Sequence, residues 1–162
     1  MPADAWVNLF VKESWKIEGL DLNTACMEHT WDRCADYHQG VFDRPCITVS
    51  QVQEAAMLFT CGYGKIRERA GMDVRVGAHI APSGGVDIRH RLHNLLQRAN
   101  EDPRDAFKLH LEFETLHPFM DGNGRTGRML WAWCMENSGI DPAWKQRGFL
   151  HTWYYQSLQG SR

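Results

Sequence analysis

We predict an all-α helical bundle that carries one small β-hairpin. Apolar residues recur at steps of three and four over most of the sequence, which is the spacing of amphipathic helices. In residues 75–86 the pattern instead turns short and glycine-rich and ends at Ser83-Gly84-Gly85, as expected of a hairpin. The 162 residues contain no repeats, low-complexity tracts or obvious linker, and a chain of this length normally forms one domain with a substantial core.

The expected helices follow in order along the chain. The first covers residues 6–15 and ends near Gly19, and the second covers residues 22–37. Residues 50–53, Ser-Gln-Val-Gln, resemble a capping box at the start of a third helix. Residues 149–158 belong to a final helix. The apolar face of the third helix consists of Val52, Ala55, Ala56 and Phe59, and that of a fourth consists of Ile88, Leu92, Leu95, Leu96 and Ala99.

A helix over residues 105–116 leads into the most informative part of the sequence. Asp102-Pro103 supplies an N-cap and a first-turn proline just upstream. The residues on its apolar face are Ala106, Leu109, His110, Phe113 and Leu116. Because Pro118 disfavours helical geometry at the residue before it, we expect His117 at the helix exit, with its ring beside the following loop.

A glycine-rich loop over residues 121–124 joins this helix to another over residues 126–137. An Asp-Gly or Asn-Gly pair can mark a hairpin turn, but neither flank alternates as strands would. The downstream stretch has helical spacing instead. Gly122 and Gly124 let the backbone approach a ligand closely. The first N–H groups of the second helix are unpaired and point outward, so this helix start is a predicted anion site.

Two arginines occupy positions where they oppose the dipole of that helix. Arg125 and Arg128 lie in its first turns on roughly one face. A cation there costs about 0.3–1 kcal/mol, so an anion supplied from elsewhere would explain both. Arginine suits phosphate oxygens because its planar fork binds two at once. Asp121 fits beside a phosphate when magnesium lies between them. His117 can accept a proton near neutral pH, because the ordinary pKa of histidine is about 6.5.

Residues 117–128 read His-Pro-Phe-Met-Asp-Gly-Asn-Gly-Arg-Thr-Gly-Arg. This run resembles the signature of the Fic (Fic/Doc) family, His-Pro-Phe-x-Asp/Glu-Gly-Asn-Gly-Arg-x-x-Arg, at every specified position. Residues 113–116, Phe-Glu-Thr-Leu, look like the family's usual approach to the histidine, and residues 75–82 resemble the segment that forms its β-hairpin flap. The likeness covers residues 47–137 and implies a Fic-type helical bundle with a flap over the active site.

The resemblance implies a protein adenylyltransferase, which moves AMP from ATP to a serine, threonine or tyrosine hydroxyl of a target protein. His117 would be the general base, and Asp121 would hold the Mg²⁺ that bridges the α- and β-phosphates. Arg128 would hold the γ-phosphate and orient the α-phosphate for in-line attack, while Phe119 would be a buried anchor for the loop. The anion hole would be formed by Gly122, Asn123 and Gly124, with Arg125 also on the phosphates. Such transfer depends mostly on positioning and charge stabilisation.

A second resemblance lies near the N-terminus. Residues 14–19, Ser-Trp-Lys-Ile-Glu-Gly, resemble the family's inhibitory pattern, Ser/Thr-x-x-x-Glu-Gly/Asn. The inhibitory residues would be Ser14, Glu18 and Gly19. The resemblance implies that Glu18 pairs with Arg128, occupies the place of the γ-phosphate and leaves ATP in a non-productive pose. Some family members with such a glutamate also remove AMP, so Glu18 is a candidate for both roles.

The hairpin is, by the same resemblance, a docking edge for the target protein, because a target segment can add to a free strand edge. The residues expected to dock the target are Val74, Arg75, Val76, Gly77, Ala78, His79 and Ile80. The chain would then consist of an inhibitory helix segment at residues 1–21 and a Fic catalytic domain at residues 22–162, within one compact domain overall.

Bulk composition limits the remaining function classes. The formal net charge of −2 argues against a basic surface of the kind that nucleic-acid binding requires. No run reaches eighteen apolar residues and the N-terminus lacks a charged-then-apolar signal, so we expect no membrane partner and a cytoplasmic protein. The five cysteines are odd in number and form no Cys-x-x-Cys, which indicates buried, reduced thiols. The expected partners are ATP and a protein target, and a homo-oligomer is compatible with the regulation.

Two alternatives stay open at this point. Relatives transfer UMP, phosphocholine or phosphate, so the same fold serves other donors, although Gly-Asn-Gly-Arg at residues 122–125 and Arg128 favour a nucleoside triphosphate in the usual orientation. The other alternative is a non-enzymatic nucleotide-binding regulator. A missing base or metal ligand would favour it, yet both His117 and Asp121 are present.

Overall fold

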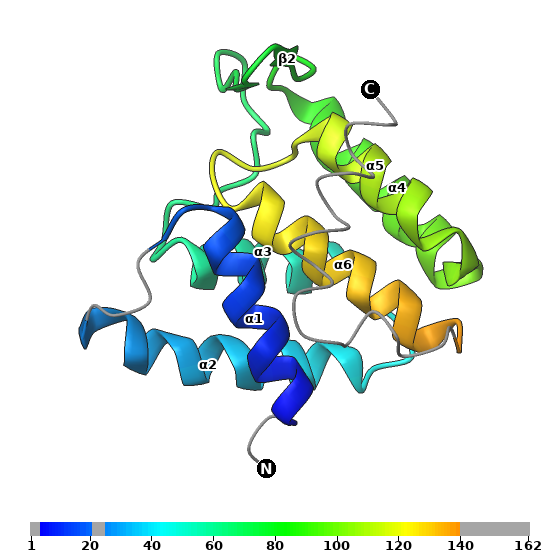
Figure 1. The fold of residues 1–162 in the computed structure, drawn as a ribbon. Helices are drawn as coiled ribbons and strands as arrows, with labels where there is room; N and C mark the ends of the chain where they lie inside the picture. Colours follow the sequence, from blue (N-terminus) through cyan, green and yellow to red (C-terminus); the bar gives the residue numbers. More distant parts are fainter. Residues whose placement is uncertain (1–3, 21–24, 140–162) are drawn as a thin grey trace. The chain divides into compact units, whose positions relative to one another are not determined.

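The computed structural model describes residues 4–20 and 25–139 (Figure 1). Within these ranges it contains six α-helices, one 3₁₀-helix and one two-stranded sheet, which confirms the predicted helical fold with a small hairpin. The chain divides into two compact units. The N-terminal unit includes residues 1–43, and the second unit is Arg44–Gly139, which contains the hairpin and the glycine-rich loop. The helix predicted over residues 149–158 lies outside the described residues.

Two helices make up the described part of the N-terminal unit. They are α1, Ala5–Ile17, and α2, Ala25–Phe42, and both correspond to predicted helices. The second continues past its expected end at residue 37, and packing explains the extension. The rings of Phe42 and Trp6 stack with their centroids 5.3 Å apart, so the last turn of α2 belongs to the core of this unit.

Helix α3, Val49–Phe59, begins earlier than predicted. Its N-cap is Thr48, whose hydroxyl accepts the N–H of Gln51 at 3.3 Å while the Gln51 side chain accepts the N–H of Thr48 at 2.8 Å. The capping box therefore starts at Thr48, and its prediction at residues 50–53 was wrong. The predicted apolar face is confirmed, because an earlier start of the helix leaves the same residues on its buried side. The buried residues are Val52, Ala55, Ala56 and Phe59.

The predicted hairpin is present between α3 and α4. Strands β1, Arg75–Val76, and β2, His79–Ile80, pair antiparallel in the register Arg75↔Ile80 and Val76↔His79. Gly77 in the turn has φ of 58°, a left-handed value that glycine adopts without strain. Both strands are short, as the glycine-rich pattern indicated.

Helix α4, Val86–Glu101, follows the hairpin and also fixes the start of α3. The side-chain amide of Asn100 donates to the carbonyl of Ile47 and accepts its N–H, both at 2.8 Å. These two bonds hold the chain just before Thr48, which is why the helix begins there. The predicted apolar face of α4 is buried and consists of Ile88, Leu92, Leu95, Leu96 and Ala99.

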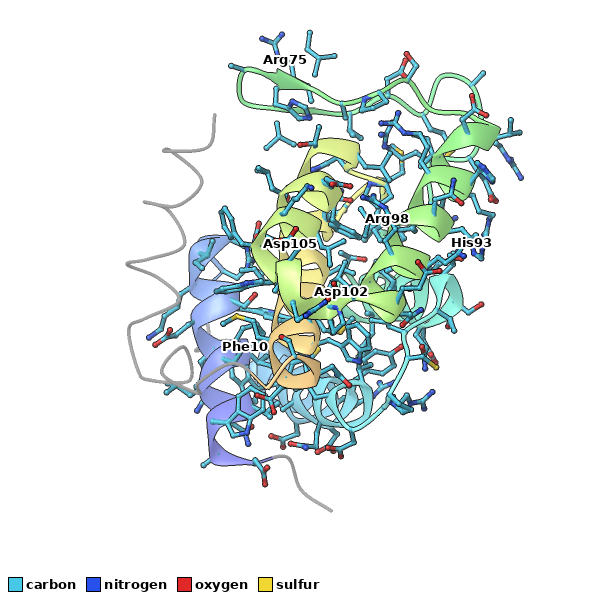
Figure 2. The ribbon with its side chains drawn as sticks, turned by 90° about the vertical axis from the view of Figure 1, so that its right-hand side faces the viewer. Phe10, Arg75, His93, Arg98, Asp102 and Asp105 are labelled. Atoms are coloured by element: carbon cyan, nitrogen blue, oxygen red, sulfur yellow. The ribbon has the colours of Figure 1, made fainter. Side chains whose placement is uncertain are left out.

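Helices α5, Ala106–Leu116, and α6, Asn123–Asn137, flank the glycine-rich loop. A 3₁₀-helix, Pro103–Asp105, precedes α5, and the Asp102 side chain caps it by accepting the N–H of Arg104 at 3.1 Å. Within this unit α6 packs against α3 and α5, and α5 packs against α4. Figure 2 shows Arg75 and Asp102 at opposite ends of α4 and α5, so the hairpin lies at one end of this helix pair.

Two compositional expectations can be compared with the described residues. None of their helices combines the length and the apolar character that a bilayer crossing requires. The cysteines whose side chains are described are free thiols, as predicted. Cys34 and Cys134 are buried, but Cys46 and Cys61 are exposed, so the expectation that the thiols are buried was wrong for these two.

Candidate active site

The turn at His117 ends α5 in a conformation that histidine rarely adopts. Its φ and ψ are 49° and 61°, and its N–H donates to the carbonyl of Phe113 at 2.8 Å. A non-glycine residue in this left-handed region costs about 1–3 kcal/mol and persists only where its surroundings hold it. Pro118 has no N–H with which to continue the helix. The predicted position of His117 at the helix exit is confirmed.

Arg67 holds this turn from a distant part of the sequence. Its side chain is fully buried, Nε donates to the carbonyl of His117 at 2.7 Å, and Nη2 donates to that of Leu116 at 3.0 Å. Nη1 donates to the carbonyls of Met72 at 3.0 Å and Pro82 at 2.8 Å, on the two sides of the hairpin's base. Burial lowers the pKa of Arg67, but arginine stays charged at physiological pH. One buried cation therefore joins the histidine turn to the hairpin.

The His117 ring presents Nδ1 to Glu114, one turn earlier on α5. Nδ1 lies 3.2 Å from the Glu114 carbonyl oxygen and 3.8 Å from its carboxylate. The carbonyl oxygen can only accept, so the contact requires the proton on Nδ1 and leaves the lone pair on Nε2. The His117 side chain is 13% exposed and is mostly shielded from water. The ring thus has the tautomer that a general base needs.

The loop after the histidine is anchored at Phe119. This side chain is fully buried, as predicted, and its backbone pairs with Ile66 in an isolated antiparallel bridge. The buried amide of Asn123 accepts the N–H of Phe119 at 2.8 Å and donates to its carbonyl at 2.7 Å. The amide side chain is therefore used to close the loop. Any contribution of Asn123 to an anion hole would therefore come from its backbone N–H.

Within the described ranges, no side chain caps the N-terminus of α6. The N-cap is Gly122, with φ of 80°, and a Cβ at this position would lie 2.7 Å from Cγ2 of Thr60. Glycine is thus required both by the backbone conformation and by the space. The N–H groups of Asn123 and Gly124 make no hydrogen bond within the described chain. An uncapped helix start of this kind is suited to an anion.

Asp121 is the residue that fits a divalent cation. Its side chain is 58% exposed, its Oδ1 accepts the N–H of Gly122 at 2.6 Å, and the same oxygen lies 3.8 Å from Nη2 of Arg125. Among residues 4–20 and 25–139, no group of three or more His, Cys, Asp and Glu side chains gathers as a metal site. A single exposed carboxylate suits magnesium, which typically takes its other ligands from phosphate and water.

The two arginines predicted to bind phosphate are both buried. Arg125 is 8% exposed and its Nη1 donates to the carbonyl of Phe59, while Arg128 is 1% exposed. Burial, together with a smaller effect of the nearby Arg128 charge, lowers the pKa of His110 to about 3. Arg128 therefore lies near His110, on the side of α6 that faces α5.

The hairpin contacts α5 through His79. Nε2 of His79 lies 3.0 Å from the carbonyl oxygen of Thr115, two residues before His117. Val76 and Ile80 are exposed large apolar residues on the strands, at 39% and 72%. The structure confirms the hairpin itself, while its use by a target protein stays a prediction.

The segment that resembles the inhibitory pattern lies in the N-terminal unit, at the end of α1. Ser14 is fully buried, Glu18 is the exposed C-cap residue, and Gly19 follows with φ of 70°. The N–H of Gly19 donates to the carbonyl of Lys16 at 3.0 Å and that of Leu20 to Trp15 at 3.3 Å, which is a Schellman motif. The predicted pairing of Glu18 with a residue of the other unit stays a prediction.

The second unit thus brings together the histidine, the glycine-rich loop, both arginines and the hairpin. Sequence reasoning did not identify Arg67 as part of this site, nor Glu114 as the partner of His117. Comparison with known protein families supports the assignment of this unit. The sequence model of the Fic/DOC family matches residues 47–135, more than half of the chain.

Proposed function

Because the chain belongs to the Fic/DOC family and is therefore a Fic-domain transferase, we propose that it transfers AMP from ATP to a hydroxyl side chain of a target protein. Members of this family generally transfer nucleotides or other groups onto proteins. One observation carries the choice of a nucleotide. A histidine with its lone pair on Nε2 is followed, after a single anchored loop, by an uncapped helix start that bears two buried arginines.

His117 acts as the general base in this proposal. Nε2 takes the proton of the acceptor hydroxyl while the oxygen forms a bond to the α-phosphorus of ATP. The bond from that phosphorus to the bridging oxygen of the β-phosphate breaks, and pyrophosphate leaves. The proton then resides on Nε2 until it is lost to solvent. Transfer of this kind is mainly a matter of positioning and charge stabilisation.

The N-terminus of α6 binds the phosphates. The backbone N–H groups of Asn123 and Gly124 are unpaired donors within the described chain, and they point along a dipole that favours anions. Arg125 and Arg128 add positive charge on the same helix. Asp121 would hold Mg²⁺, which neutralises charge on the phosphates when bound. These residues orient the nucleotide beside His117.

Glu18 restrains the activity. A carboxylate at the C-terminal end of a helix interacts unfavourably with the helix dipole, so the stability of α1 does not explain why this residue is an acid. In the proposed inhibited state its carboxylate takes the place of the γ-phosphate at Arg128. Removal of one partner of such a pair leaves the other charge alone, which favours binding of a nucleotide anion in its place.

A labelling experiment tests the proposal. The Glu18→Gly protein is incubated with Mg²⁺ and a cell lysate, in parallel with ATP labelled at the α- or γ-phosphate, α-labelled UTP and labelled CDP-choline. We expect label that depends on His117 from α-labelled ATP alone, at least about a hundredfold above that obtained when His117→Ala is added. Label from γ-labelled ATP that is lost with His117→Ala would instead indicate phosphate transfer by this protein. Label from UTP alone or from CDP-choline alone would show that the transferred group is UMP or phosphocholine instead of AMP. Binding of ATP without any labelling would contradict a transferase.

A further inference from the structure

We propose that Glu114 is a positioning residue for His117, a buried acid that holds the ring and stabilises its protonated form. The inference rests on the proposed function, because it concerns the same base. Nδ1 of His117 lies close to two oxygens of this one residue, the carbonyl at 3.2 Å and the carboxylate at 3.8 Å. The carbonyl sets the tautomer, whereas the carboxylate adds a negative charge beside the ring.

The fold makes room for this carboxylate. Glu114 is 7% exposed, and burial of a carboxylate is unfavourable unless it has a partner. A Cβ at Gly127, on the facing helix α6, would lie 2.4 Å from Oε1 of Glu114 and 2.9 Å from Cδ1 of Phe113. Glycine inside a helix is destabilising, so its presence at this position has a compensating reason. The missing side chain of Gly127 is the space that the Glu114 carboxylate occupies.

A second histidine flanks the carboxylate but does not donate to it. Nδ1 of His110 lies 2.9 Å from the carbonyl oxygen of Gly127, so this nitrogen carries the proton. Nε2 of His110, 4.0 Å from Oε1 of Glu114, then carries a lone pair. Burial lowers the pKa of His110 to about 3, so the ring stays neutral. Of the two histidines beside Glu114, His117 is the one that directs an N–H toward it.

This arrangement assigns a specific task to the acid. When Nε2 of His117 takes the hydroxyl proton, the ring becomes an imidazolium with a proton on each nitrogen. Glu114 accepts neither proton; its charge makes the imidazolium more stable and the base correspondingly stronger. The other ionisable groups described around this turn include Arg67, which bonds the His117 carbonyl, His79, which bonds the Thr115 carbonyl, and Arg128 on α6, whose charge lowers the pKa of the neighbouring His110. The bonds of Arg67 and His79 go to backbone carbonyls, so a substitution of the Glu114 side chain does not remove them.

The test compares Glu114→Gln with Glu112→Gln in the Glu18→Gly protein. Glu112 is a matched control on the same helix, because its carboxylate forms a surface ion pair with Arg98. The pKa of His117 is measured by NMR titration, and kcat and KM for ATP are measured from AMP transfer. For Glu114→Gln we expect the pKa to fall by about one pH unit, kcat to fall about tenfold or more, and KM to change less than about twofold. Glu112→Gln should change none of these.

The outcomes separate this inference from the proposed function. An unchanged His117 pKa, or an unchanged kcat, in folded Glu114→Gln overturns the inference. A fall in the pKa with no AMP transfer by any variant, the parent included, supports the pairing and contradicts the proposed function. If Glu114→Gln does not fold, the His117 pKa measured in the protein with Glu114 intact tests the inference. A His117 pKa above the ordinary value of about 6.5 supports the inference, and one at or below it overturns it.

Discussion

The glycine-rich loop and the proposed inhibitory segment both place charge at the unfavourable end of a helix. Arg125 and Arg128 stand at the start of α6, and Glu18 stands at the end of α1. They differ in how the charge is held. Both arginines are buried and the loop before them is fixed by hydrogen bonds and steric contacts, whereas Glu18 is exposed at the end of its helix. The loop is therefore held in one arrangement by its surroundings, whereas the Glu18 side chain is open to solvent.

This difference shows which motif residues carry information about function. Gly19 is explained by local structure alone, because the Schellman motif at the end of α1 requires a left-handed residue there. Its match to an inhibitory pattern therefore adds little. Glu18 is not explained in this way, since a helix end built only for stability would carry a cation. The hypothesis of autoinhibition depends on Glu18.

The largest expected effect comes from removing that carboxylate. We predict that Glu18→Gly raises the rate of AMP transfer and self-modification about a hundredfold, because a broken charge pair of about 3 kcal/mol corresponds to that factor. The measurement is the initial rate of label transfer from α-labelled ATP. The control is Asp36→Asn, which removes an exposed acid from α2 of the same unit. Equal rates in Glu18→Gly and the parent would show that the segment does not inhibit.

A smaller effect is expected from opening the catalytic loop. Asn123→Ala removes both bonds to the backbone of Phe119 and leaves buried groups unpaired, so we predict that the free energy of unfolding falls by about 2–3 kcal/mol. Urea denaturation measures the change. Asn94→Ala is the control, because the contact of Asn94 with His90 lies on the exposed surface of α4. Its loss should change the free energy of unfolding by less than about 0.5 kcal/mol. Similar losses in both variants would argue against a loop closed by Asn123.

The smallest effect concerns the glycine of the inhibitory motif. Gly19→Ala should lower the free energy of unfolding by about 1 kcal/mol because alanine is strained at φ of 70°, although nothing within 4 Å obstructs its Cβ. Gly40→Ala, inside α2 and equally unobstructed, should raise it by about 0.5–1 kcal/mol. The same denaturation series checks both. A rate of AMP transfer for Gly19→Ala as high as that of Glu18→Gly would give the glycine a role beyond the helix end.

Local sequence was enough for most of the fold. The helical faces, the hairpin at residues 75–86 and the exit of the chain at His117 follow from spacing, glycine content and a proline, all of which act within a few residues. The buried anchor Phe119 was also predicted. The start of α3 was not, because Thr48 and Ser50 are both plausible caps. The choice is made by Asn100, which is distant in sequence and bonds Ile47.

The supporting residues of the site could not be found in this way. Arg67 bonds the carbonyls of residues 72, 82, 116 and 117, and backbone carbonyls leave no signature in a sequence. Glu114 was noticed only as part of the approach to the histidine. Its contact with His117 depends on the space at Gly127, on another helix. Periodicity indicates which face of a helix is buried, but not what a buried polar group touches.

The four bonds of Arg67 have a consequence for how an acceptor would be chosen. They tie the foot of the hairpin to the turn that carries His117, so the strand edge and the base keep a fixed separation. The pairing register of a target segment on this edge would therefore determine which of its residues reaches His117. Because side chains alternate along a strand, a shift of one residue turns the hydroxyl to the opposite face. A shift of the same peptide by one residue along the edge would then decide whether its hydroxyl is modified.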